Sequence, residues 1–270
     1  MNFPELTDSE LSFTDHVATL AFNRDDLRNA LTGTRIVDDI CNTVDWIHSE
    51  LQVRCLILTG NGKAFSSGGN VKDIRDASND FGGTPAELAH KYRTGIQRMS
   101  KAMHSLEVPS IAAVNGPAIG AGFDLACMCD IRLGCPQTRM GETFINLGII
   151  PGDGGAWFLQ RLVGYQRAAE LTFSGRVIKV DEAMSLGLVL EQTTTEQLLP
   201  RAQELAADFA AKPPQALRMT KRLMKSAQRL ELEDFLDLCS SYQASCHHTA
   251  DHKLAIAAFL DKSSTDYQGS

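Results

Sequence analysis

The stretches AFSSGGN (residues 64–70) and NGPAIGAGFD (residues 115–124) decide how this chain folds. Each glycine-rich turn follows an apolar run, residues 53–58 before the first and residues 111–114 before the second. Glycine tolerates a positive φ and lets another molecule approach the backbone closely, so such turns at strand ends can present free N–H groups. Two of these turns can aim two amides at one oxygen, an arrangement that stabilises a developing oxyanion.

Strand and helix patterns alternate around these turns. We expect a strand over 12–22, a helix over 30–49, a buried strand in VRCLILTG (53–60), a helix before 106, and strands at 110–116 and 130–133. Residues 76–90 are polar and contain glycine, which is typical of a loop that could form part of a pocket wall. The alternation predicts an α/β fold with parallel strands. After about residue 195 the pattern is helical only, so we place a core at 1–195 and a helical C-terminal region at 196–270.

Composition narrows the possible function classes. The chain has 270 residues, 43% of them hydrophobic, and a formal net charge of −7, which argues against a nucleic-acid partner. The N-terminal MNFPELTDSELSF has no basic stretch followed by an apolar one, so we expect no signal peptide, and no apolar run is long enough for a membrane helix. The seven cysteines are an odd number in a chain too long to need disulfides, which favours a cytoplasmic location.

Common catalytic and metal-binding motifs do not fit. Gly62 and Lys63 lack the glycine that a phosphate-binding P-loop requires five residues earlier. The chain has no early dinucleotide-binding glycine motif and no G-x-S-x-G nucleophile turn. The late group of cysteines and histidines lies on an expected amphipathic helix and contains no paired C-x-x-C, so we expect no metal site.

Five ordered stretches resemble the crotonase (enoyl-CoA hydratase/isomerase) superfamily. They are NRDDLRNAL (23–31), LTGNGKAFSSGGNVKDI (58–74), PSIAAVNGPAIGAGFDLACMCDIRL (109–133), INLGIIPGDGGAWFLQRLVG (145–164) and AFLDK (258–262). The resemblance extends over nearly the whole chain. It implies a spiral of repeated ββα units, with a helical C-terminal region that supports assembly into a homotrimer or a dimer of trimers.

The resemblance also implies chemistry on acyl-CoA thioesters. Two backbone amides stabilise a thioester enolate in this family, and by position they are those of Gly69 and Ala121. Coenzyme A enters as part of the substrate, with no tightly bound cofactor. The positions implied for its binding are Ala64, Ser66, Ser67, Gly68, Asn70 and Val71, with Arg28 near the phosphates and Phe259 and Lys262 supplied by a neighbouring subunit.

The acids beside the amide pair depart from the family pattern. Hydration in this family uses two glutamates, and their positions are occupied by Asp124 and Phe144. Phenylalanine cannot transfer a proton, and its apolar ring would raise the pKa of a neighbouring carboxyl. Asp153, in an Asp-Gly-Gly context similar to that of the naphthoate-synthase branch, is favoured over Glu142 as a second acid. The alternatives are that Asp153 is only a turn residue and Asp124 only a helix-start acid.

These observations lead to an acyl-CoA-processing enzyme with Asp124 as the principal acid/base and Asp153 as a second acid. The sequence supports enoyl-CoA hydration and double-bond isomerisation nearly equally. The family as a whole favours hydration, whereas Phe144 favours isomerisation. Another enolate reaction, as in a hydrolase, decarboxylase or C–C lyase, is the next alternative. The alternative from another class is a non-catalytic acyl-CoA-binding protein, which would retain the two amides but would not catalyse a reaction.

Overall fold

The computed structural model describes residues 2–270. Its main sheet has six strands in the order β1-β2-β3-β4-β6-β9, and all neighbouring pairs except β1 and β2 are parallel. The strands are β1 (Ser9–Thr14), β2 (Val17–Phe22), β3 (Cys55–Gly60), β4 (Ser110–Val114), β6 (Ile131–Gly134) and β9 (Glu191–Gln192). Parallel strands separated by helices confirm the α/β prediction.

Side chains of the central strands alternate between two apolar cores. Leu56 and Leu58 of β3 pack on the side of α1 (Ile36–Ser49) and α4 (Ile96–Ser105), whereas Ile57 packs on the opposite side against α9 (Leu198–Ala210). Successive residues of a strand point to opposite faces, so a strand covered by helices on both faces is apolar throughout. This burial explains the continuous apolar run of β3.

The strand expected over 12–22 is in fact a hairpin. β1 and β2 pair antiparallel, and the two residues between them, Asp15 and His16, have φ values of 49° and 67°. A two-residue hairpin turn with both central residues at positive φ matches the twist of the paired strands, and aspartate and histidine tolerate that region better than most residues. The near-continuous alternation of residues 12–22 conceals this turn.

The predicted loop over 76–90 is partly helical. It follows α2 (Val71–Arg75) and contains the short turn η2 (Asn79–Phe81), but α3 (Pro85–Thr94) begins within the range assigned to the loop. Thr84 caps α3: its hydroxyl accepts from the Glu87 amide, and the Glu87 carboxylate accepts from the Thr84 amide. This capping box and the proline at the first helical position start the helix despite the polar composition.

A second, smaller sheet lies beside the main one and carries the second glycine turn. It contains β5 (Pro117–Ile119), β7 (Arg139–Gly141) and β8 (Ile178–Lys179), and β5 leads directly into α5 (Ala121–Met128). The remaining elements of the core are η1 (Asp25–Leu27), η3 (Thr143–Leu147), α6 (Gly155–Val163), α7 (Tyr165–Ser174) and α8 (Val180–Ser185).

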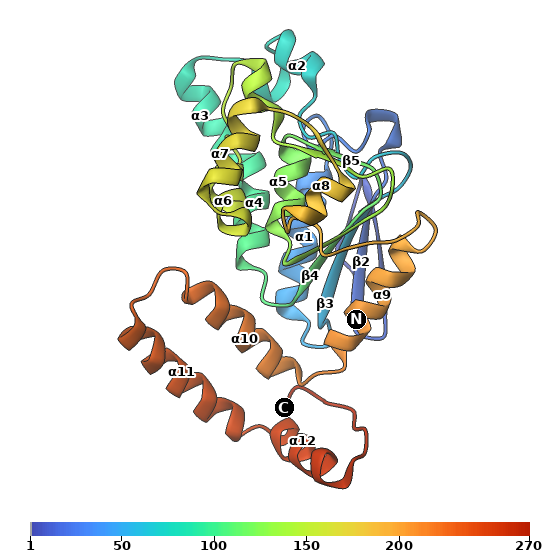
Figure 1. Cartoon of the computed structure of the whole chain (residues 1–270), viewed down its shortest axis with the longest axis vertical. Helices are drawn as coiled ribbons and strands as arrows, with labels where there is room; N and C mark the ends of the chain where they lie inside the picture. Colours follow the sequence, from blue (N-terminus) through green and yellow to red (C-terminus); the bar gives the residue numbers. More distant parts are fainter. Residues whose placement is uncertain (1) are drawn as a thin grey trace.

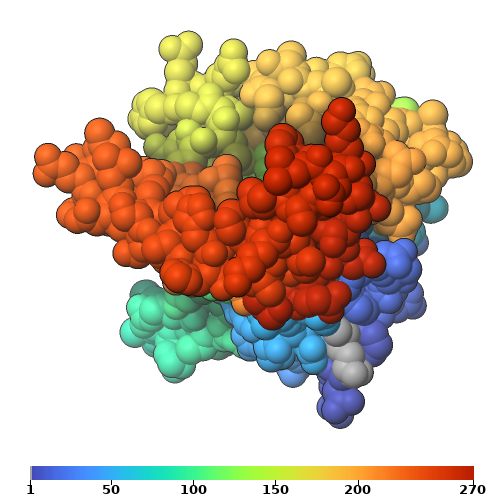
Figure 2. Space-filling view, turned by 90° about the horizontal axis from the view of Figure 1, so that it is seen from below, coloured from blue at the N-terminus to red at the C-terminus, as the bar shows by residue number. Residues whose placement is uncertain are grey.

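The C-terminal region is helical, as predicted. α9 belongs to the core packing, because Ala202, Ala206 and Ala210 are buried against the main sheet. α10 (Pro214–Ser226), α11 (Leu232–His247) and α12 (Ala250–Asp261) lie below the sheet in Figure 1 and form a ridge across the underside in Figure 2. Buried Arg218 ties α10 to the core by donating to the carbonyls of residues 47, 50 and 53. Within residues 2–270, no helix is both long and apolar enough to cross a membrane.

Candidate active site

The two glycine turns lie against each other. The Ser66 amide donates to the Pro117 carbonyl at 3.1 Å, and the Ile119 amide donates to the Ser66 carbonyl at 3.0 Å. A Cβ atom at Gly68 would stand 2.9 Å from the Ala121 nitrogen, and one at Gly122 would stand 2.8 Å from the Ser66 Cβ. Glycine at both positions therefore lets the turns approach closely enough to bring their amides together.

The amides of Gly69 and Ala121 have no acceptor among residues 2–270. Both residues line the same pocket, Gly69 from the first turn and Ala121 as the first residue of α5. A helix N-terminus carries a partial positive charge, so the Ala121 amide is well suited to an anionic oxygen. Gly120 precedes it with φ 54° and ψ −123°, a conformation that glycine adopts without strain. Two amides without an acceptor, one from each glycine turn, thus border the same pocket.

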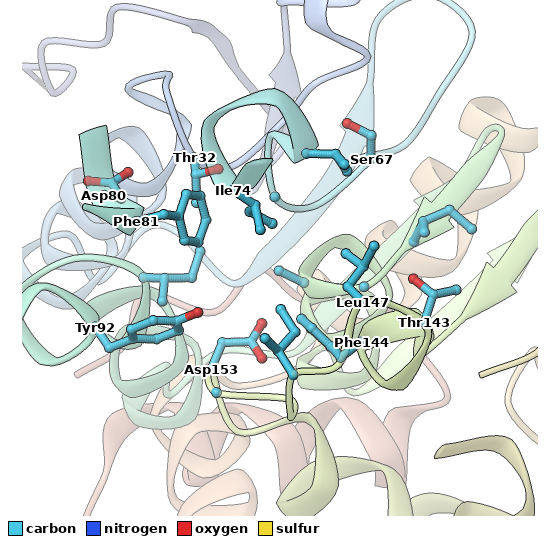
Figure 3. Close-up of a pocket in the computed structure, with 18 of the residues that line it drawn as sticks. Thr32, Ser67, Ile74, Asp80, Phe81, Tyr92, Thr143, Phe144, Leu147 and Asp153 are labelled. Carbon is cyan, nitrogen blue, oxygen red and sulfur yellow. The ribbon is translucent and has the colours of Figure 1, made fainter. Parts of the chain in front are cut away.

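The pocket beside these amides is walled mainly by apolar side chains (Figure 3). The walls come from α2, the η2 turn, α3, α4 and η3, so the segment at 76–90 contributes to the lining as expected. The apolar and aromatic lining side chains are Val71, Ile74, Phe81, Tyr92, Ile96, Ile119, Ala121, Phe144, Leu147 and Ile149. A pocket of this kind suits an uncharged hydrocarbon group.

Of the two predicted acids, Asp153 faces the pocket and Asp124 lies behind it. Asp153 is 4% exposed and lines the pocket, whereas Asp124 is fully buried and is absent from the described lining. Asp124 projects from α5 against Gly155, the first residue of α6, where a Cβ would overlap its carboxyl oxygens. The structure therefore brings the two carboxyl groups together but gives them different access to a ligand.

Burial and mutual repulsion raise the proton affinity of this pair. Burial, followed by the negative charge of Asp153, raises the pKa of Asp124 well above its ordinary value. Burial also raises the pKa of Asp153, and a hydrogen bond from Asp124 offsets part of this rise. Asp153, the member that faces the pocket, is the one whose charge solvent can reach.

Glu142 and Phe144 occupy different environments, although only one residue separates them. Glu142 is 1% exposed, hydrogen bonds with Thr172 and is not among the described pocket-lining residues. Phe144 lines the pocket, and its ring atoms Cε1 and Cζ lie 3.7 Å from where a Cβ of Gly120 would be. The position at which the resemblance implies a second glutamate thus presents a hydrocarbon ring to the site.

The residues expected to bind coenzyme A divide into two groups. Ser67 and Val71 line the pocket, and Arg28 is half exposed beside Ser67, whose amide donates to the Arg28 carbonyl at 2.9 Å. The others serve the turn itself: the Ala64 carbonyl accepts from Asn29, the Ser66 hydroxyl donates to the Asn29 carbonyl, and Asn70 caps α2 by accepting from the Lys72 amide. Gly68 allows the contact between the turns.

Phe259 and Lys262 lie far from the pocket of their own chain. Both are exposed at the end of α12, at the opposite end of the molecule from α2 and α3 (Figure 1). They cannot contribute to the site within one subunit. This placement is compatible with the expectation that they reach a neighbouring subunit.

Sequence reasoning missed Tyr92 and Lys91, two adjacent residues of α3. In Figure 3 the Tyr92 hydroxyl is directed toward Asp153, and burial together with the Asp153 charge raises the pKa of Tyr92. Lys91 donates through Nζ to the carbonyls of Asn79 at 2.7 Å and Gly82 at 2.8 Å, which holds the turn that carries Phe81. The capping pair Thr84 and Glu87, at N-cap and N3 of α3, was the available signal for this helix.

The described residues contain no group of three or more His, Cys, Asp or Glu side chains placed to hold a metal ion. Two of the late histidines do lie in contact, since His247 Nδ1 is 3.1 Å from His252 Nε2 on the surface.

Comparison with known proteins assigns this architecture to a family. Residues 12–270 match the family model described as enoyl-CoA hydratase/isomerase. The chain is 32% identical to the short-chain-enoyl-CoA hydratase of Clostridium acetobutylicum, over 96% of each protein, and 31% identical to the 1,2-epoxyphenylacetyl-CoA isomerase of Escherichia coli, over 94% and 95%.

Solved structures agree with this assignment. An enoyl-CoA hydratase from Bacillus anthracis superposes with a TM-score of 0.90 at 31% identity, covering 98% of this chain and 100% of that one. A putative enoyl-CoA hydratase from Streptomyces coelicolor gives 0.91 at 32% identity, covering 100% and 97%. The predicted crotonase-like fold is confirmed, and the chain belongs to the enoyl-CoA hydratase/isomerase family.

Proposed function

We propose that this protein binds an enoyl-CoA thioester and moves one proton between two carbons of its acyl chain, which shifts the double bond. The observation that carries the proposal is the buried carboxyl of Asp153 on the wall that also presents Gly69 and Ala121. The other lining carboxylate, Asp80, is exposed, and Phe144 stands where hydration would need a second acid. One carboxylate is sufficient for isomerisation, because the same group can remove and return the proton.

The proposed steps balance with the chain's own groups. The Asp153 carboxylate removes a proton from the carbon next to the thioester carbonyl of a 3-enoyl-CoA. The electron pair moves onto the carbonyl oxygen, and the amides of Gly69 and Ala121 stabilise the resulting enolate. The enolate then collapses, the double bond moves into conjugation with the thioester, and Asp153 returns its proton to the fourth carbon.

A specific observation favours hydration as the second candidate. The Tyr92 hydroxyl is directed toward Asp153, and a phenol can both donate and accept a hydrogen bond. Tyr92 and Asp153 could hold one water molecule between them, in place of the two carboxylates of the family pattern. Hydration is then expected to be slow, because a phenol is a weaker acid than a carboxylic acid.

The pocket supports an uncharged acyl group as the substrate class. Its walls are apolar, and the ammonium of Lys91 already donates to two backbone carbonyls. A distal carboxylate on the acyl chain would therefore lose its hydration, and the one cation among the described lining residues, Lys91, already has two backbone acceptors. We expect aliphatic or aromatic hydrocarbon chains to be preferred over dicarboxylic ones.

Coenzyme A is proposed to lie along residues 64–71 with Arg28 near its phosphates. Phe259 and Lys262 are proposed to come from a neighbour in a homotrimer or dimer of trimers. Large apolar side chains on the helical ridge support such an assembly, since Leu232 of α11 and Phe259 and Leu260 of α12 are each more than two-thirds exposed. Light scattering coupled to size exclusion gives the subunit number directly. We also propose a cytoplasmic location, from the odd number of cysteines.

The test of the function is a two-substrate assay that follows the absorbance of the conjugated thioester. Isomerisation creates this absorbance from a 3-enoyl-CoA, whereas hydration removes it from crotonyl-CoA. We expect a gain with the first substrate and a slower loss with the second. If both signals stay flat while the thioesters bind, the protein is an acyl-CoA-binding protein and the proposal fails.

A further inference from the structure

Asp124 and Asp153 form a carboxyl pair of which one member faces the pocket. Asp153 reaches the pocket wall, and fully buried Asp124 lies behind it. The backbone of Gly155 closes the space beside the Asp124 carboxyl, so this side chain cannot swing away in that direction. An acyl chain in the pocket therefore meets Asp153 first.

The contact between the two carboxyl groups requires a proton. Two carboxylates both accept hydrogen bonds and cannot bond to each other, whereas a carboxylic acid can donate to a carboxylate. No donor group among the described residues hydrogen-bonds to either carboxyl, so each carboxyl is the partner available to the other. Two neighbouring negative charges without a cation would also be costly in a buried site. The resting pair consequently holds one proton.

The surroundings of the two residues decide where that proton resides. Asp153 lies on the pocket wall and directly precedes the N-cap of α6, so solvent in the pocket and the positive end of this helix favour a carboxylate there. Asp124 is fully buried away from the pocket, and the other titratable groups near it, Glu142 and Cys127, add no positive charge. Tyr92 is the remaining titratable group near the pair, on the pocket side of Asp153. The proton belongs on Asp124.

We infer that Asp124 is a positioning residue: as a buried acid it donates a hydrogen bond to the Asp153 carboxylate and holds that carboxylate toward the substrate. Asp153 is then the proton carrier, and Asp124 never touches the acyl chain. The inference rests on the proposed function, because the carrier role of Asp153 is part of it. It changes the roles expected from the sequence, where Asp124 is the principal acid/base.

Three variants separate positioning from proton transfer. Asp153→Asn removes the carrier and should lower kcat by at least about 100-fold, the usual scale of general acid–base catalysis. Asp124→Asn keeps a donor, because its amide can bond to Asp153, and should cost less than about tenfold. Asp124→Leu keeps the branched shape but loses the donor, so the pKa of Asp153 rises and the acidic limb of the pH–rate profile moves upward by on the order of one pH unit.

A spectroscopic readout makes the result independent of turnover. Protein labelled with carbon-13 at the aspartate carboxyl should show one protonated aspartic acid at pH 7, and that resonance should be missing from Asp124→Asn. Glu142→Gln is the matched control, since Glu142 is an equally buried acid outside the pocket lining; its labelled spectrum should keep the resonance.

Two results would overturn the inference. One is a wild-type spectrum in which every aspartate is ionised at pH 7. The other is a folded, CoA-binding Asp124→Asn variant that is as inactive as Asp153→Asn, because Asp124 would then transfer the proton itself. If wild-type protein turned over neither test substrate, the proposed function would fail, while the carbon-13 spectra would still decide the state of the pair.

Discussion

Gly155 lies directly against the carboxyl group of Asp124, so closely that a Cβ at position 155 would overlap both carboxyl oxygens. The backbone of α6 thus leaves no free space on this side of the Asp124 carboxyl. The glycine that follows Asp153 by two residues in PGDGG is required by the packing of this carboxyl pair.

Gly155→Ala should consequently damage both stability and activity. The added methyl group must displace Asp124 or α6, an overpacking that costs about 1–3 kcal/mol of unfolding free energy. Displacement of the pair should lower kcat by about 10- to 100-fold, because small errors in position are costly in catalysis. Urea unfolding and the 3-enoyl-CoA assay measure the two effects.

The control is Gly187→Ala, where a Cβ would meet nothing within 4 Å but φ is +75°. This change should cost about 1 kcal/mol through backbone strain and leave activity intact. Equal loss of activity in both variants would mean that the effect of Gly155→Ala is not local to the carboxyl pair.

Phe144→Glu should increase hydration. The new carboxyl would stand on the pocket wall where the family pattern has its second glutamate, and it could hold a water molecule together with Asp153. We expect at least about a tenfold gain in the hydration of crotonyl-CoA, a modest fraction of what general acid–base catalysis supplies. The loss of conjugated-thioester absorbance measures it.

Phe144→Gln is the matched control, since glutamine has the same shape and cannot transfer a proton. A similar gain from both variants would assign the effect to the removal of the phenyl ring. No gain from Phe144→Glu would indicate that water does not reach this side of the site.

The features that could be predicted from the sequence are those set by local chemistry. The glycine turns were predicted correctly because the contact between Gly68 and the backbone of the second turn admits no side chain. The hairpin at Asp15 and His16 was missed because neither residue is glycine, and α3 was missed because its capping box was outweighed by polar composition.

The different environments of Asp124 and Asp153 could not be predicted, because they depend on tertiary packing. Asp124 stands in α5 and is sealed by α6, about 30 residues later in the chain. Tyr92 reaches Asp153 from α3, before either acid in the sequence. No local pattern encodes which of several polar residues will face a cavity.

Tyr92→Phe separates the two candidate reactions. If the hydroxyl holds water together with Asp153, its removal should lower hydration at least about tenfold. Isomerisation needs no water and should change by less than about threefold, so the ratio of the two rates is the informative quantity. Equal losses in both reactions would show that Tyr92 acts on Asp153 rather than on water.

The buried acid Asp124 should make the protein less stable as pH rises. Its pKa is raised in the folded state, so above its unfolded value of 3.8 the folded chain binds more protons than the unfolded chain. Its contribution to stability is complete below that value and is lost progressively as pH rises toward the folded pKa. One such proton gives a slope of at most about 1.4 kcal/mol per pH unit.

Urea unfolding of wild type and Asp124→Asn at several pH values between about pH 5 and pH 8 isolates this contribution. Asp153 and Glu142, whose pKa values are also raised by burial, remain in the variant. Most of their contribution to the pH dependence of stability therefore cancels in the comparison. The variant should lose less stability with rising pH than wild type. Parallel curves would mean that Asp124 binds no extra proton in the folded state.

A mixing experiment tests whether Phe259 and Lys262 complete a neighbouring site. Subunits carrying Asp153→Asn have an intact α12 but no proton carrier. Subunits carrying Phe259→Ala and Lys262→Ala together keep Asp153 but lose the groups proposed to contact coenzyme A. Because these groups are exposed on the opposite end of their own chain from the pocket, neither variant can repair its own defect.

When the two kinds of subunit are co-expressed with different tags and purified through both, mixed assemblies bring an intact Asp153 site beside an intact α12. The double variant alone should show a raised KM for the CoA thioester, and the mixed assembly should regain a fraction of sites with the wild-type KM. A mixed sample that behaves as the sum of its two parents would exclude an α12 contribution across subunits. Mixed wild-type and Asp153→Asn assemblies provide the reference, since their active sites should keep the wild-type KM throughout.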